Sequence, residues 1–102
     1  MRNIQVRLKG HESAQCKVFK VYDNTDTLVE IQFISYRTLV IVANKNDDGT
    51  WDLQCSGTYS RTTAKQITWF LREYFPALTY QDMSAIAGSG DIKKARLQGA
   101  ID

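Results

Sequence analysis

Apolar and polar residues alternate along several stretches of the first 60 residues, and this period of two is typical of half-buried β-strands. The clearest case is the N-terminal stretch, where Ile4, Val6 and Leu8 alternate with polar side chains. A later stretch, residues 38–43, is apolar at every position from Leu39 onward, which indicates a central strand covered on both faces. The pattern predicts strands at residues 2–9, 16–22, 28–34, 38–43 and 51–55.

Short polar connections separate these stretches, such as residues 23–26 and 44–49. Their Asn, Asp and Gly residues favour tight turns because they tolerate left-handed backbone conformations. Parallel strands need crossover connections of about a dozen residues or more, and the connections between these strands are shorter. We therefore expect an antiparallel meander of about five strands. In that arrangement residues 2–9 form an exposed edge strand that could pair with a second copy.

The pattern changes near residue 60, where apolar residues begin to recur at the spacing of an α-helix. Ser60 or Thr62 is the expected N-cap, and Pro76 ends the helix after about Phe75. One face of this helix is apolar and is expected to cover the sheet. That face consists of Ala64, Ile67, Leu71, Tyr74 and Phe75, with Phe70 at its edge.

A second, shorter helix is expected after Thr79, because Thr followed three residues later by Asp82 is a helix-capping pattern. Glycines at positions 88 and 90 end it. Residues 91–102 are weakly apolar and basic, and we expect them to be a C-terminal tail or a short helix. The sequence thus predicts a single α+β domain over residues 1–90, with the sheet packed by one main C-terminal helix plus one or two short helices.

Composition agrees with one folded domain. The 102 residues are 43% hydrophobic and 24% charged, with a net charge of +2. These values are ordinary for a globular protein and unlike those of a disordered one. No apolar run has the length of a signal peptide or of a membrane span, so we expect a cytoplasmic protein with no membrane partner. Cys16 and Cys55 are accordingly expected to be free, buried thiols.

Residues that carry common catalytic chemistry are sparse. The single histidine, His11, lies in a predicted turn. A metal site needs three or four converging ligands, and a phosphate-binding loop needs a glycine pattern that this chain lacks. We therefore expect no metal, no cofactor and no enzymatic activity. One catalytic alternative stays open, in which Cys16 or Cys55 is a nucleophile and His11 is its base.

One group of side chains points to binding. On the main predicted helix, Arg61, Lys65, Trp69 and Arg72 share a face that is turned away from the sheet. Trp and Arg are the residue types that dominate protein interfaces, and cations beside an aromatic ring can also hold a nucleic-acid strand. In the alternative interpretation, the second helix or the C-terminal tail covers Trp69 and its role is structural.

Secondary binding candidates lie outside that face. Tyr36 and Arg37 fall between two strands, and Tyr59 lies where the last strand meets the helix. Tyrosines at such junctions often anchor the turn through packing and a hydroxyl hydrogen bond, which is the structural alternative. The basic residues of the C-terminal stretch could extend a nucleic-acid surface; they are Lys93, Lys94 and Arg96.

Two segments resemble a pattern in small, mostly uncharacterised proteins of bacteriophages and mobile elements. In that group an SY-x-T-x-V strand precedes a hairpin and a YS-x-TT turn enters a helix; residues 35–40 and 59–63 match these motifs. The similarity covers about residues 28–75. A histidine often stands near the position of Gln66 in that group, and its absence here weakens any role tied to that residue. The resemblance implies binding to a host protein, with anti-CRISPR proteins as one class.

Two functional hypotheses follow. The first is a small phage or mobile-element protein that binds a host protein or nucleoprotein stoichiometrically in the bacterial cytoplasm, as an anti-CRISPR or other anti-defence inhibitor. The second is a nucleic-acid-binding accessory protein that uses the basic and aromatic helix face. The first uses Arg61, Lys65, Trp69 and Arg72 as the contact surface, and the second adds the C-terminal cations.

Overall fold

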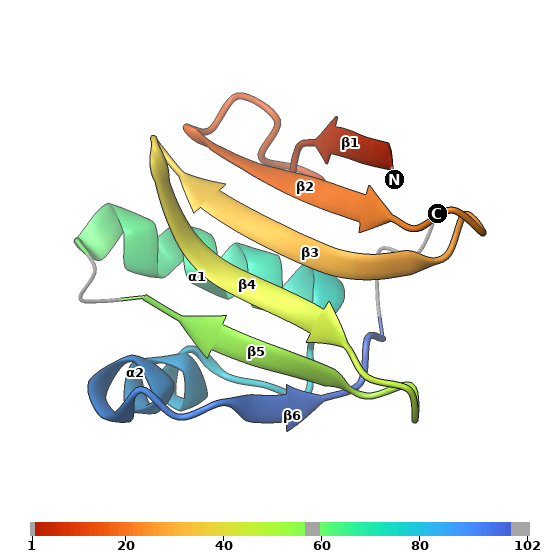
Figure 1. The fold of residues 1–102 in the computed structure, drawn as a ribbon. Helices are drawn as coiled ribbons and strands as arrows, with labels where there is room; N and C mark the ends of the chain where they lie inside the picture. Colours follow the sequence, from red (N-terminus) through yellow and green to blue (C-terminus); the bar gives the residue numbers. More distant parts are fainter. Residues whose placement is uncertain (1, 57–59, 99–102) are drawn as a thin grey trace.

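A six-stranded antiparallel sheet forms the frame of the molecule. The computed structural model describes residues 2–56 and 60–98. The strands are β1 (Arg2–Val6), β2 (Cys16–Tyr22), β3 (Leu28–Ser35), β4 (Thr38–Lys45), β5 (Trp51–Cys55) and β6 (Lys93–Ala95). The helices are α1 (Arg61–Tyr74) and α2 (Tyr80–Ser89). In the view of Figure 1, α1 lies behind the strands and α2 lies at the lower left, below β5.

The strands lie in the sheet in the order in which they occur in the chain, from β1 to β6. Each connection up to β5 is short, and the chain reaches β6 only after passing through both helices. The predicted α+β class and antiparallel meander are thereby confirmed, with one strand more than expected. β1 and β6 are the two edges of the sheet.

The extra strand corrects the expectation for residues 91–102, which was a tail or a short helix. Lys93–Ala95 instead pair with β5, and Lys94 lies opposite Asp52 with their charged groups 3.0 Å apart. Only three residues pair, so the segment is too short to show a strand period in the sequence. Residues 99–102 lie outside the described part of the chain.

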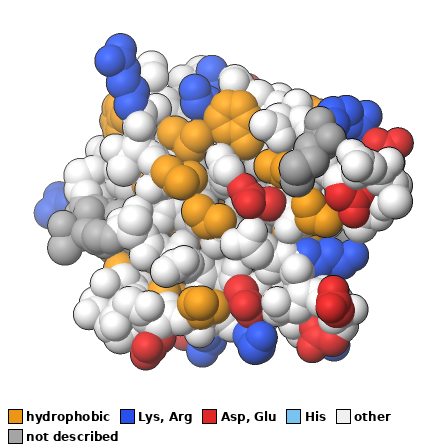
Figure 2. Space-filling model, in the orientation of Figure 1, with side chains coloured by type: hydrophobic (Ala, Val, Ile, Leu, Met, Phe, Trp, Pro, Cys, Tyr) orange, Lys and Arg blue, Asp and Glu red, His pale blue; other side chains and the backbone are white. Residues whose placement is uncertain are grey.

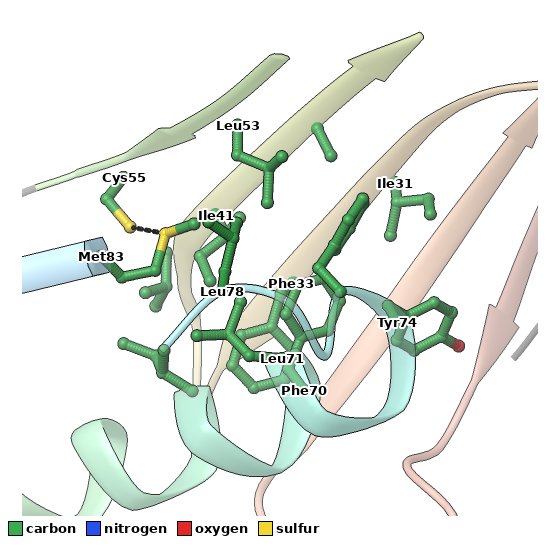
Figure 3. Packing of buried hydrophobic residues seen from close by; sticks show 14 of the residues in the cluster. Ile31, Phe33, Ile41, Leu53, Cys55, Phe70, Leu71, Tyr74, Leu78 and Met83 are labelled. Atoms are coloured by element: carbon green, nitrogen blue, oxygen red, sulfur yellow. Dashed lines mark hydrogen bonds between the residues drawn. The ribbon is translucent and has the colours of Figure 1, made fainter. Parts of the chain in front are cut away.

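The core lies between the sheet and the helices (Figure 3). Val18, Phe33, Ile41 and Cys55 sit on one rung of β2 to β5, and all of them are buried. Phe70 of α1 is fully buried, and its ring centre lies 4.8 Å from that of Phe33. Phe70 therefore lies at the centre of the helix's apolar face, whereas the sequence analysis placed it at the edge of that face.

Capping groups fix where the helices start and stop. Ser60 is the N-cap of α1, and its Oγ accepts a hydrogen bond of 3.2 Å from the Thr63 N–H. In α2 the Thr79 hydroxyl and the Asp82 carboxylate each bond the other residue's backbone N–H, which is a complete capping box. Gly90 closes α2 with a φ of 76°, a left-handed conformation that favours glycine.

Both helices cover the same face of the sheet, because the buried residues of α1 and α2 belong to one cluster with the inward residues of the strands. No helix of residues 2–56 or 60–98 lies on the opposite face (Figure 1). This overturns one expectation: β4 is a central strand, but it is covered on one face only. We call the uncovered side the open face.

Candidate functional site

The open face carries an apolar patch. Successive strand residues point to opposite sides, so the neighbours of the buried Val18, Phe33 and Ile41 face outward. Hydrophobic side chains gather over β2, β3 and β4 on this side of the molecule (Figure 2). We define the open-face patch as Phe19, Ile34, Leu39 and Val42, which are half-buried except for Leu39, exposed by 41%.

A β-bulge shapes the middle of this patch. Phe33 pairs with Ile41 and Ile34 pairs with Leu39, so Val40 is an extra residue in β4. A bulge bends its strand and re-aims neighbouring side chains. Val40 is almost fully buried here, while Leu39 projects outward.

A small hollow opens beside Leu39. Its volume is about 140 Å³, and its lining is mostly apolar. A cavity of roughly 150 Å³ is large enough to hold a benzene molecule. The hollow could therefore accept one aromatic or branched aliphatic side chain of a partner. It is lined by Leu39, Val40, Val42, Gln54, Cys55 and Ser56.

Tyr36 stands at the tip of the β3–β4 hairpin, where it lines a second hollow with Val40 and Thr63. Its side chain is 53% exposed, and its φ of 56° lies in the left-handed region that bulky residues rarely adopt. A packed anchor would be buried, so the exposure argues against the structural alternative for this tyrosine. Arg37 beside it is exposed as well. Tyr59, the third candidate of this group, lies outside the described residues.

Polar groups surround the open-face patch. The Lys17 ammonium lies 5.6 Å from the centre of the Phe19 ring. Within β3, the Gln32 side chain donates a hydrogen bond to the Glu30 carboxylate two residues before it. On β5, hydrogen bonds from Asn46 and from Lys94 hold the pKa of Asp52 below its usual value. An apolar patch with a polar rim is typical of a protein-binding surface.

The outer face of α1 is different in character. Arg61, Lys65 and Arg72 are exposed, as the sequence predicts. Trp69 is half-buried and packs against the core, and its ring is stacked on His11 with the ring centres 3.6 Å apart. One side of the indole is therefore already occupied within the chain.

The segment that covers Trp69 is the β1–β2 loop, whereas the sequence alternatives named the second helix or the C-terminal tail. The loop is fixed at several points. The Lys9 N–H donates to Glu73 of α1 at 2.8 Å. The Arg7 guanidinium donates to the carbonyls of Ala14 and Cys16. His11 is thus held against the helix as part of the fold.

The C-terminal cations do not extend the α1 face. Lys93 and Lys94 are consecutive strand residues and point to opposite sides of the sheet. Lys94 binds Asp52 on the open side, whereas Lys93 lies near α2. Arg96 lies beside Gly49 of the β4–β5 hairpin. The structure therefore separates these three side chains instead of assembling one basic surface.

The thiols lie in the core. Cys16 and Cys55 are buried and not disulfide-bonded, as predicted, and β3 and β4 separate their strands. Three strand spacings amount to roughly 14 Å, twice the Cα separation of about 7 Å that a disulfide allows. Burial raises the pKa of the Cys16 thiol, and the Cys55 thiol lies 3.1 Å from the Met83 sulfur (Figure 3). Within residues 2–56 and 60–98, no three His, Cys, Asp or Glu side chains converge as metal ligands.

The two motif segments of the sequence meet in space. The buried Ser35 hydroxyl donates to the Gln66 side-chain oxygen at 2.5 Å and lies 3.0 Å from the Thr63 hydroxyl. Gln66 is only 3% exposed, so it is a structural residue here. These contacts tie the β3–β4 hairpin to the first turns of α1, which gives both motifs a structural role.

Comparison with protein-family models, with curated proteins and with solved structures finds no match for this chain. In the described part of the chain, neither α1 nor α2 combines the length and the apolar character that a bilayer-crossing helix needs.

The main feature that the sequence missed is the open-face patch. Val42 belongs to the strand that was expected to be covered on both faces, and Phe19 and Ile34 were not singled out. A signal was present, because 38–43 is apolar at outward as well as inward positions. Such a run is expected both for a strand covered on two faces and for a strand with one face that binds a partner. The sequence does not distinguish these cases, because they differ in which face of the sheet the helices cover.

Proposed function

We propose that this chain is a non-catalytic binding protein that forms a stoichiometric complex with another protein or nucleoprotein. The resemblance to phage and mobile-element proteins gives the specific form of the proposal, an anti-CRISPR or other anti-defence inhibitor in the bacterial cytoplasm. The open-face patch is the proposed contact surface, with Tyr36 and Arg37 at the adjoining hairpin tip.

The observation that carries the proposal is the one-sided cover of the sheet. A six-stranded sheet with helices on one face only leaves outward side chains in water, and most such faces are polar. Here Leu39 is exposed by 41% beside a hollow of about 140 Å³. Tyr36 is exposed by 53% and lines a second hollow, of about 240 Å³, with Val40 and Thr63. Large exposed apolar residues around a hollow are suited to a partner's anchoring side chain.

Three observations favour binding over catalysis. The Cys16 thiol is buried and its pKa is raised, which disfavours the reactive thiolate. The Cys55 thiol packs against Met83. The His11 ring is stacked on Trp69, where the stack fixes its orientation. These contacts weaken the proposal of a cysteine nucleophile with His11 as its base.

A second contact surface is the outer face of α1. Its exposed cations, Arg61, Lys65 and Arg72, would fit an acidic partner, either a protein or a nucleic acid. The half-buried, stacked Trp69 has less area to offer such a partner than a free indole would have. We therefore place this face second, as a surface that contributes to orientation and to the rate of association.

The first experiment is capture of partners from a host lysate by the tagged protein, with and without nuclease. One host protein recovered in stoichiometric amount after nuclease treatment supports the proposal and supplies the partner for binding assays. Recovery that disappears with nuclease would favour the nucleic-acid alternative. That alternative also predicts an affinity that falls steeply with salt.

The second experiment tests the surface with the captured partner. Leu39→Asp puts a charge into the open-face patch and should weaken binding by about 30-fold or more, the effect of losing an interface hot spot. The matched control is Ala85→Asp, because Ala85 is an exposed residue of α2, and α2 lies on the covered side of the sheet. Equal affinities of the two variants would exclude the open face as the contact.

A further inference from the structure

The two edges of the sheet differ in how they are protected. An edge strand presents unpaired backbone N–H and C=O groups, and proteins usually protect such edges with short strands, lysines, prolines or bulges. β6 has such protection, since it is only three residues long and carries the exposed Lys93 and Lys94. β1 is five residues long and pairs with β2 without a register shift.

The charges near β1 are drawn away from its outer edge. Arg2 lies over the Tyr22 ring at 4.7 Å and pairs with Asp26 at 3.4 Å. The Arg7 guanidinium is bound to the carbonyls of Ala14 and Cys16. Residues 3–6 between them are Asn, Ile, Gln and Val, without a charge or a proline. Among the described residues, no further strand pairs with the outer edge of β1, and residues 3–6 of that edge carry no charge.

We propose that β1 pairs antiparallel with β1 of a second copy, so that two chains form one continuous twelve-stranded sheet (two sheets of six). The pair is centred on Ile4. Asn3 then lies opposite Gln5 of the other copy, and Arg2 lies opposite Val6. This register places amide beside amide on the open side and Ile4 beside Ile4 on the helix side, with no like charges directly opposite.

The second copy is the occupant that this edge fits best, for two reasons. Pairing of identical strands about a two-fold axis uses the same edge on both chains, so the contact closes. The edges that remain after pairing are the two β6 strands, which are short and lysine-bearing and do not accept a further chain. The assembly therefore stops at a dimer. Self-association is independent of the proposed partner binding, because the pairing uses the edge and leaves the open-face patch uncovered.

The test is sedimentation equilibrium of the full chain over a range of concentrations, with variants that change side chains but keep the backbone of β1. Asn3→Lys with Gln5→Lys places like charges opposite each other twice per dimer, and should raise the dissociation constant by about tenfold or more. Asn3→Lys with Gln5→Glu places opposite charges in the same positions, and should dimerise at least as tightly as the unaltered chain.

The matched control is Asn44→Lys with Gln54→Lys, which adds the same charge at exposed positions of β4 and β5 and leaves the edge unchanged. It should dimerise like the unaltered protein, and all variants should keep its melting temperature. The proposal is wrong if the chain is monomeric at every concentration. It is equally wrong if the lysine pair at positions 3 and 5 leaves the dimer intact, or if the control variant dissociates, which would indicate packing through the open face.

Discussion

The open face of the sheet and the outer face of α1 are the two candidate contact surfaces, and their large side chains differ in how far they are exposed. On the open face Leu39 is exposed by 41%, and Tyr36 at the adjoining hairpin tip is exposed by 53%. On α1, Trp69 is stacked on His11 and packs against the core, and only the cations around it are exposed. An aromatic residue that is already stacked within its own chain has less area left for a partner. Exposure, more than residue type, therefore decides which surface is suited to binding.

The largest expected effect of a single change on these surfaces is that of Trp69→Ala on stability. The half-buried ring packs on the core and on His11, so its loss should lower the free energy of unfolding by about 2 kcal/mol, half the value for a fully buried ring. Chemical denaturation would measure this. A variant with unchanged stability would show that the indole is a free contact residue, and would reverse the ranking of the two surfaces.

His11→Ala is the control for that change, since it removes the stack and keeps the tryptophan. The double variant completes a thermodynamic cycle, and the coupling between the two rings should be about 1 kcal/mol. A coupling near zero would contradict the stacked geometry.

A smaller effect of opposite sign is expected for Tyr36→Gly. Glycine adopts the φ of 56° without the penalty of about 1–2 kcal/mol that a side chain incurs. The greater freedom of glycine in the unfolded chain offsets part of this gain. The free energy of unfolding should therefore rise by up to about 1 kcal/mol, while binding to the partner weakens. A variant that is more stable but binds the partner less tightly would identify Tyr36 as a residue whose role is to contact the partner.

Tyr36→Ala is the matched control, because alanine loses the ring but keeps the Cβ that makes the left-handed conformation costly. It should weaken binding like the glycine variant without the gain in stability. If both variants were stabilised equally, the backbone strain would not be the cause.

The smallest effect is expected from charge reversal on α1. Arg61→Glu with Lys65→Glu should reduce affinity for a protein partner by about threefold, less than 1 kcal/mol, because exposed charges are screened by solvent and salt. The reduction should shrink further at high salt. A loss as large as that of Leu39→Asp would make α1 the main contact surface.

The fold was predictable from the sequence where the hydrophobic period was long enough to read. The strands β2 to β5 and both helices were predicted close to their observed bounds, because each has several alternating or helically spaced apolar residues. β6 was not predictable, since three residues show no period and their pairing depends on where α2 returns the chain.

The candidate sites were predictable only in part. The exposure of the α1 cations follows from helical spacing alone. The His11 stack does not, because it joins a loop residue to a helix 58 positions further along the chain. The open-face patch depends on which face of the sheet the helices cover. The alternation of apolar and polar residues along each strand does not determine which face that is. Long-range packing therefore decides what the sequence leaves open.

The order of the strands also has a consequence for how the chain folds. Each strand from β2 to β5 pairs with the strand before it, so β1 to β5 can assemble by a series of hairpin closures. Contacts between near neighbours in the chain speed folding, and distant ones slow it. The pairing of β5 with β6 is the exception, because it must wait until α1 and α2 have been synthesised and docked. β6 is therefore expected to join last and to open first, as a local transition that leaves the five-stranded meander intact.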